Sequence, residues 1–426
     1  MGYGFILGNL SWNALNTQVE TAIRKDVATG AGATVTTQTF PNAVASGDTT
    51  RDSTVLWARS SVPGRVIFVV FPKTISRPLL RFASAEVTDT SVPAKVEITK
   101  LRPGTNYSYV VIAPNGERVR GSFTTAHAPG SFAGLRFGVS GDSRGELGPY
   151  PAISNADERN LNFFVELGDT IYADVTSPAV LKPQADTREE FRAKHNEVYT
   201  SRFGLNTWGD LRASTSVFST IDDHEVTNDF AGGAPPSSDP RFAGFPGAFI
   251  NDTPLYEDGL QAFQEYNPIR AEFYGDTGDE RTSGERKLYR ARTYGNDAAV
   301  LMLDARSFRD QELISPNPTN PADIARFILQ SFDFNPATGQ PTGTRRTMLG
   351  SQQLQDLKND LLEAQTSGVT WKFVMVPEPI QNLGLVGASD RFEGYAAERT
   401  DLLRFIDQNG IQNVVFVAAD VHGTVV

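Results

Sequence analysis

The sequence predicts an α/β domain that is preceded by an all-β sandwich of immunoglobulin or fibronectin type. Between residues 39 and 126, short β-branched or aromatic segments are separated by turn residues such as Pro103-Gly104 and Asn115-Gly116, and this spacing is typical of small antiparallel sandwiches. From Leu135 onward, short apolar segments alternate with helical patterns, which indicates a layered α/β domain. A chain of 426 residues is also longer than one ordinary domain requires.

The first region contains five predicted strands, at residues 54–58, 65–71, 95–99, 106–112 and 118–124. We interpret residues 1–38 as an N-terminal extension, residues 39–126 as the sandwich domain, and residues 133–426 as the α/β domain. The alternative is that the β region forms an integral part of the next unit. Because Val426 directly follows a strand and a polar motif, we expect the fold to continue beyond this residue.

In the α/β region, strands are predicted at residues 135–139, 161–167, 216–221, 298–303, 371–376 and 413–418. Helices are predicted at residues 188–203, 350–365 and 398–406, where apolar residues recur at helical spacing. Two inserts, at residues 231–249 and 314–347, are rich in Pro, Gly and Asn. Inserts of that length in a compact domain are expected to be lids or binding loops.

The composition excludes several kinds of function. The formal net charge of −11 argues against nucleic acid or an anionic membrane as a partner. No run approaches the ~20 apolar residues of a membrane span, and the N-terminal residues lack the pattern of a signal peptide. The sequence has no cysteine, so disulfides, thiolate metal ligands and a cysteine nucleophile are excluded.

Polar residues follow four of the predicted strands. They are Asp142, then Asp169 with Tyr172, then Asp222, Asp223 and His224, and finally Asp420 and His422. Strands of the same polarity deliver such residues to one edge of a sheet. Carboxylates gathered there repel one another unless cations neutralise them, so the pattern predicts bound metal. A set without sulfur suits Fe³⁺, Mn²⁺, Zn²⁺, Mg²⁺ or Ca²⁺.

Each of these features also has a simpler interpretation. Gly168-Asp169 could form an ordinary turn, and Tyr172 could be a packing residue. The two histidines outside the four motifs, His127 and His195, are expected to be structural.

The motifs, taken in order, resemble the PhoD-like alkaline phosphatases of the metallophosphoesterase superfamily. The likeness covers residues from about Phe40 to the C-terminus. It rests on the segments VASGD at residues 44–48, LGDTIY at 167–172, DDHE at 222–225 with Asn228, LDARSF at 303–308, LGSQQ at 349–353, and DVH at 420–422. The resemblance implies two packed sheets flanked by helices, preceded by a β-sandwich, in an exported protein.

The resemblance also implies roles for individual residues. Asp169 would bridge two metals, Tyr172 would be a phenolate ligand to Fe³⁺, and Asp223 would stand where relatives place an asparagine ligand. Asp420 and His422 would be further ligands, Asn228 a second candidate, and His224 the group that contacts the leaving group or the phosphoryl oxygens. The metal pair implied by the family is Fe³⁺ with Ca²⁺.

The sequence departs from the family pattern at two places. Relatives carry Ser-Cys-Gln after the first strand, with the cysteine bound to iron, whereas this chain has Ser-Gly-Asp-Ser-Arg at residues 140–144. Asp142 would therefore replace a thiolate by a harder carboxylate, which leaves the metals open among Fe³⁺, Ca²⁺, Zn²⁺, Mn²⁺ and Mg²⁺. The closing motif also begins with Ala419, where glycine is expected.

The predicted function is the metal-dependent hydrolysis of phosphate monoesters or diesters by a metal-activated water. Arg144 and Arg306 are candidates for holding a phosphoryl oxygen, although salt bridges to Asp142 or Asp304 are an equal alternative. The Pro-rich insert at residues 231–249 favours a lipid-like diester, as in phospholipase D-like relatives. A binding protein with a degenerate site is the alternative of another class. The residues that count against it are Asp169, Tyr172, His224 and His422.

Overall fold

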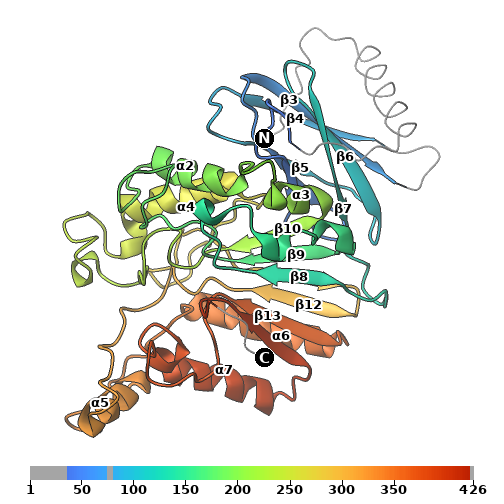
Figure 1. Cartoon of the computed structure of the whole chain (residues 1–426). Coiled ribbons are helices and arrows are strands. Elements are labelled where there is room, and N and C mark those ends of the chain that lie inside the picture. Colours follow the sequence, from blue (N-terminus) through green and yellow to red (C-terminus); the bar gives the residue numbers. More distant parts are fainter. Residues whose placement is uncertain (1–35, 74–79, 423–426) are drawn as a thin grey trace.

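The computed structural model describes residues 36–73 and 80–422, so the predicted N-terminal extension lies almost wholly outside the described residues. Its centre is a pair of stacked sheets with helices on both outer faces, and a third sheet lies beside the first (Figure 1). The six-stranded sheet has the order β5-β2-β1-β10-β9-β8, the four-stranded central sheet has the order β11-β12-β13-β14, and the third sheet has the order β4-β3-β6-β7.

The strands are β1 (Val44–Gly47), β2 (Thr54–Ala58), β3 (Gly64–Pro72), β4 (Arg81–Val87), β5 (Ala94–Ile98), β6 (Asn106–Ile112), β7 (Arg118–Thr124), β8 (Phe137–Ser140), β9 (Phe163–Leu167), β10 (Ser216–Thr220), β11 (Arg290–Tyr294), β12 (Ala298–Met302), β13 (Trp371–Val376) and β14 (Val414–Ala418). The α-helices are α2 (Arg188–Tyr199), α3 (Thr207–Ser214), α4 (Pro254–Tyr266), α5 (Pro321–Ser331), α6 (Ser351–Thr366) and α7 (Ala396–Gln408).

These sheets confirm the mixed α/β prediction and agree with a β region at the start of the described chain. The fibronectin type of that region stays a prediction. β1 pairs in parallel with β10, with Ser46 opposite Ser216, so the six-stranded sheet crosses the predicted boundary between the two regions. Its other early strands, β2 and β5, pack against the third sheet through a core that includes Leu56, Phe68 and Tyr109.

Several elements differ from the prediction. The insert at residues 314–347 is not loop throughout, because it contains α5, whose first position is Pro321 and whose N-cap Asn320 accepts hydrogen bonds from two backbone N–H groups. The helix predicted at residues 188–203 ends at Tyr199. Two further helices, α3 and α4, and three strands, β1, β4 and β11, were not predicted.

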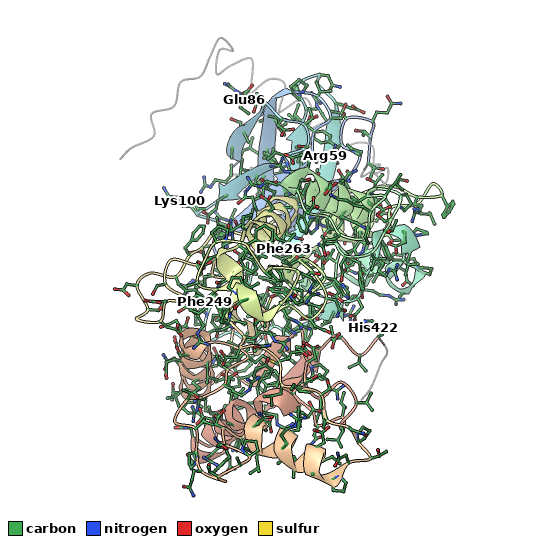
Figure 2. All side chains as sticks on the ribbon, turned by 90° about the vertical axis from the view of Figure 1, so that its left-hand side faces the viewer. Arg59, Glu86, Lys100, Phe249, Phe263 and His422 are labelled. Carbon is green, nitrogen blue, oxygen red and sulfur yellow. The ribbon has the colours of Figure 1, made fainter. Side chains whose placement is uncertain are left out.

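The central strand β9 is buried on both faces. Phe163, Val165 and Leu167 face a core shared with the other central sheet, and Phe164 faces the core beneath α2, α3 and α4. An uninterrupted apolar strand is the pattern expected where both faces of a parallel sheet are covered. Phe263 of α4 belongs to that outer core (Figure 2), while α6 and α7 cover the second sheet.

β8, β9 and β10 run parallel to one another, as do β12, β13 and β14. The loops that follow these strands therefore carry the polar motifs to neighbouring sheet edges. In the part of the chain that the structure describes, no helix has both the length and the apolar character to cross a membrane.

Candidate metal centre and active site

Four of the predicted site residues adopt a left-handed backbone conformation directly after their strands. Asp142, Asp169, Asp420 and His422 have φ angles of 58°, 52°, 59° and 52°. Non-glycine residues in this region cost about 1–2 kcal/mol each and occur mostly where the surrounding structure enforces them, often at functional sites. Gly168 has a φ of 89°, and a Cβ there would lie 2.2 Å from Asp222 N, so only glycine lets the β9 and β10 loops meet.

Asp169 lies at the junction of two groups of metal-ligand side chains. Its carboxylate lies with Asp142 and His422 in one group, and with Asp223 and His224 in the other, and the ligand atoms of each group are all within 4.8 Å of one another. The first group joins the loops after β8, β9 and β14, because Ser143 N donates to Asp169 O (2.7 Å) and His422 Nε2 lies 3.7 Å from Asp142 Oδ1. His422 is labelled in Figure 2, on the segment that follows β14.

The charge and hydrogen bonding of these groups fit a cation. Asp142 Oδ1 and Asp169 Oδ2 are buried and have no hydrogen-bond partner among the described residues, although buried carboxylate oxygens are normally satisfied. Burial, and after it the charges of Asp223 and Asp222, raise the pKa of Asp169 well above its usual value. A bound cation would supply the missing partner and reverse the repulsion. The residues present therefore suit a metal centre with oxygen and nitrogen ligands.

Glu225 fixes the conformation of this junction. Its buried carboxylate accepts hydrogen bonds from the backbone N–H groups of Asp169 (3.0 Å), Thr170 (2.8 Å) and Asp222 (2.8 Å). Three N–H donors from two different loops thus converge on one side chain. Glu225 stands next to a predicted site residue in the sequence, but the convergence of those donors has no signal in the sequence.

His224 is held by a partner that the sequence analysis did not assign. Its Nδ1 lies 2.6 Å from Asp174 Oδ1, and its ring stacks on Tyr172 with centroids 4.0 Å apart. Burial lowers the pKa of His224, but the hydrogen bond that its ring donates to Asp174 and the charge of Asp223 outweigh burial and raise that pKa. Because Asp174 binds Nδ1, the other ring nitrogen, Nε2, stays available to a ligand. The sequence offered one signal for Asp174 as a site residue, since it follows Tyr172 by two residues.

The two candidate arginines lie in different surroundings. Arg144 lies over the Tyr172 ring, with Cζ 5.3 Å from the centroid, and it pairs with Glu146. Arg306 is fully buried, and its guanidinium contacts Asp222 (2.6 Å), Asp390 (2.7 Å) and Glu378. The guanidinium of Arg306 is thus committed to carboxylates other than Asp142 and Asp304. Of these two arginines, Arg144 is the one with a partly exposed side chain, and it lies beside Tyr172, a candidate metal ligand.

Asp420 and Asn228 lie outside the two groups around Asp169. Asp420 forms a separate acidic group with Glu378 and Asp390, next to Arg306. Asn228 is exposed, and its backbone N–H donates to Asp174 Oδ2 (2.8 Å). Of the two histidines expected to be structural, His195 is completely buried and stacks on Tyr266.

The two departures from the family pattern are in contact. An added Cβ on Gly141 would lie 2.8 Å from the Cβ of Ala419. A side chain at position 141 and an alanine at position 419 would therefore compete for the same space. Because position 141 is a glycine, the side chain of Ala419 has room, so the two departures fit each other sterically.

The comparisons with known proteins bear on the family and the fold of the chain. Residues 26–127 match the model of the PhoD-like phosphatase N-terminal domain, and residues 135–426 match that of the PhoD-like phosphatase. Alkaline phosphatase D from Bacillus subtilis (strain 168) is 26% identical over 420 residues, which cover 90% of this chain and 64% of that protein. The chain thus spans less than two thirds of that relative. A solved structure of PhoD has the same fold, with a TM-score of 0.68 and 24% identity over 92% of this chain and 73% of the other.

The family model covers most of the chain and includes every predicted site residue. The resemblance drawn from the sequence motifs is thereby confirmed, and the chain belongs to the PhoD-like phosphatase family.

Proposed function

We propose that this protein hydrolyses phosphate esters at a metal centre organised around Asp169. The observation that carries the proposal is the position of Asp169 in both groups of ligand side chains, with a buried oxygen that has no hydrogen-bond partner. In the proposed centre, Asp142, Asp169, Tyr172 and His422 would hold one ion, and Asp169 and Asp223 would hold the other. Asn228 and Asp420 are further proposed ligands. Bound cations would polarise the phosphoryl oxygens and acidify a nucleophilic water.

The remaining residues have roles that their surroundings support. His224, oriented by Asp174, is proposed to donate a proton from Nε2 to the leaving oxygen. Arg144 is proposed to hold a phosphoryl oxygen, because guanidinium offers two donors in one plane. Arg306, the other candidate for this task, is better suited to neutralising Asp222, Glu378 and Asp390.

The proposal is tested by measuring turnover of p-nitrophenyl phosphate and of its bis-ester by the purified protein. We expect hydrolysis of at least one ester, loss of turnover after chelation, and recovery when Fe³⁺, Ca²⁺, Mn²⁺, Zn²⁺ or Mg²⁺ is returned singly or in pairs. Turnover of both esters would show that the centre hydrolyses phosphate diesters as well as monoesters. A protein that binds metal and phosphate without turning over either ester would be a binding protein instead.

Asp174→Asn is expected to lower kcat about 10–100-fold while metal content stays unchanged, as is typical when a partner of a site residue is altered. The reason is that Asp174 holds the His224 ring at 2.6 Å and so aims its Nε2. The deficit should be larger for an alkyl leaving group than for p-nitrophenolate, which departs without a proton. Asp186→Asn, at an exposed aspartate paired with Lys182, is the matched control. An equal deficit for both leaving groups would argue against proton donation by His224.

Tyr172→Phe is expected to bleach the protein if the centre contains Fe³⁺, because phenolate-to-iron charge transfer requires the hydroxyl group. The iron content and visible spectrum are measured together. Tyr150→Phe is the control, since Tyr150 hydrogen-bonds Arg144 O and lies outside the ligand groups. A colourless wild-type protein with stoichiometric ferric iron would refute the assignment of Tyr172 as a ligand.

A further inference from the structure

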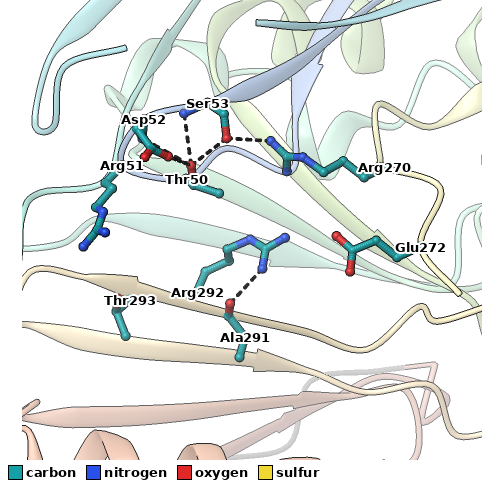
Figure 3. A pocket seen from close by; sticks show the side chains of 9 residues that line it. All are labelled: Thr50, Arg51, Asp52, Ser53, Arg270, Glu272, Ala291, Arg292 and Thr293. Atoms are coloured by element: carbon teal, nitrogen blue, oxygen red, sulfur yellow. Dashed lines mark hydrogen bonds between the residues drawn. The ribbon is translucent and has the colours of Figure 1, made fainter. Parts of the chain in front are cut away.

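A polar cavity separate from the metal centre lies where the turn between β1 and β2 meets β11. It has a volume of about 370 Å³ and is lined by Thr50, Arg51, Ser53, Arg270, Glu272 and Arg292 among others (Figure 3). We call it the arginine pocket. None of its lining residues belongs to the groups of side chains around Asp169, so its chemistry requires a separate explanation.

The floor of the arginine pocket has more positive than negative charge. Asp48 is completely buried, and its carboxylate pairs with Arg270 (3.0 Å), Arg290 (3.4 Å) and Arg292 (2.5 Å). Three guanidinium groups therefore share one buried carboxylate, which leaves a surplus of two positive charges. Three acids offset these arginines and Arg51, and all three lie toward the solvent. The side chains of Glu97 and Glu272 are 46% and 39% exposed, and Asp52, which lines the pocket beside Arg51, is exposed as well. Water and salt screen exposed charges more than buried ones, so the inner pocket stays positive.

Donor groups in the pocket remain available to a ligand. Arg51 is exposed at the rim and has neither an ion pair nor a hydrogen bond with any residue in the described ranges 36–73 and 80–422. Arg292 Nε is buried and has no hydrogen-bond partner in the same ranges. The hydroxyl groups of Thr50 and Ser53 lie 2.8 Å apart. Thr50 donates to Asp52 Oδ1 (2.9 Å), and Ser53 accepts from Arg270 Nη2 (2.8 Å), so the Ser53 hydroxyl is the one that retains a proton for a ligand (Figure 3).

We propose that the arginine pocket binds the phosphate group of a small molecule, separately from the metal centre. Guanidinium groups and hydroxyls are the donors that recognise phosphate oxygens. A ligand with one or two negative charges matches the surplus on the floor. The cavity is larger than a phosphate ion, so it has room for the organic part of a phosphorylated compound. The proposal rests on these contacts and does not depend on the proposed hydrolysis.

The test is calorimetric titration of the metal-loaded protein with inorganic phosphate and, separately, with methylphosphonate, which carries the same group on carbon. Arg51→Gln removes the uncommitted guanidinium without disturbing Asp48. Thr293→Trp fills the pocket from β11, where Thr293 is exposed. Arg118→Gln, at an exposed arginine of β7, is the matched control for a general loss of positive charge.

We expect the wild-type protein to bind phosphate in the arginine pocket. Arg51→Gln should weaken this binding about tenfold, as for the loss of one charged hydrogen bond. Thr293→Trp should abolish it, and Arg118→Gln should leave it unchanged. Binding of phosphate alone would mark a site for the free ion, and binding of both probes a site for a phosphorylated compound. The proposal is overturned if neither probe binds outside the metal centre, or if Arg51→Gln and Arg118→Gln have the same effect. Inhibition of turnover by phosphate reports the metal centre independently and should be equal in all three variants.

Discussion

Replacing Asp169 by asparagine is expected to remove both metal ions and to lower turnover on the order of 10³-fold or more, beyond the 10–100-fold typical of residues that only support a ligand. Asp169 is the one side chain shared by the group with Asp142 and His422 and the group with Asp223 and His224. An amide retains the size of the carboxylate but loses its charge, so it cannot bridge two cations. The measurement is metal content per chain together with turnover of p-nitrophenyl phosphate.

Asp142→Ala provides the comparison for this result. Asp142 belongs to only one of the two groups, so its loss should reduce metal content by one ion per chain. The remaining ion should be the one held beside Asp223. A carboxylate at position 142 should also favour hard ions over soft ones, in contrast to a thiolate. Full metal occupancy in Asp169→Asn would exclude the bridging role, and full occupancy in Asp142→Ala would make Asp142 a turn residue.

The residues around Asp169 were predictable because their signals are local. Each apolar strand runs directly into its polar motif, and β8, β9 and β10 are parallel, so strand direction alone brings Asp142, Asp169 and Asp223 to one edge. Gly168 is a local signal as well, since its conformation excludes any side chain. His422 joins them from the second sheet, which only the resemblance to a family implied.

Other parts of the site depend on contacts between distant residues. Arg306 has the sequence context of a substrate-binding arginine, yet its partners Asp222 and Asp390 each lie 84 residues away. Asp174 and His224 are 50 residues apart. The carboxylate of Glu225 accepts hydrogen bonds from backbone N–H groups of the loop after β9 and of its own loop, which follows β10. Pairings of this kind follow from how loops pack, which no local pattern encodes.

Some missed elements had usable signals. In α4, Leu255, Tyr256, Leu260 and Phe263 recur at helical spacing after Pro254 at the first position, so the helix was predictable. β11 was not, because its sequence RARTY contains two arginines and lacks the apolar pattern of a strand. The partner that lets Arg290 be buried and Arg292 half-buried there is Asp48, more than 240 residues earlier.

Asp48 is therefore expected to hold three parts of the chain together. It follows β1 and contacts Arg270 in the segment after α4, and Arg290 and Arg292 in β11. Burial raises the pKa of Asp48, but the three arginines outweigh it and hold that pKa below its ordinary value. A carboxyl with a lowered pKa stabilises the fold at pH values above its unfolded pKa, about 3.9, and this stabilisation is lost as the pH falls.

Asp48→Asn should lower the free energy of unfolding by about 3–5 kcal/mol at neutral pH, because it leaves buried guanidinium groups without their shared counter-ion. The measurement is chemical unfolding of wild type and variant across pH, and the difference between them should shrink below about pH 4. Asp52→Asn, four residues later, is the control. Asp52 is exposed, so its replacement should change stability by no more than about 0.5 kcal/mol. Equal stability of Asp48→Asn and wild type at neutral pH would mean that the arginines find other partners, and that the sheets are joined by apolar packing alone.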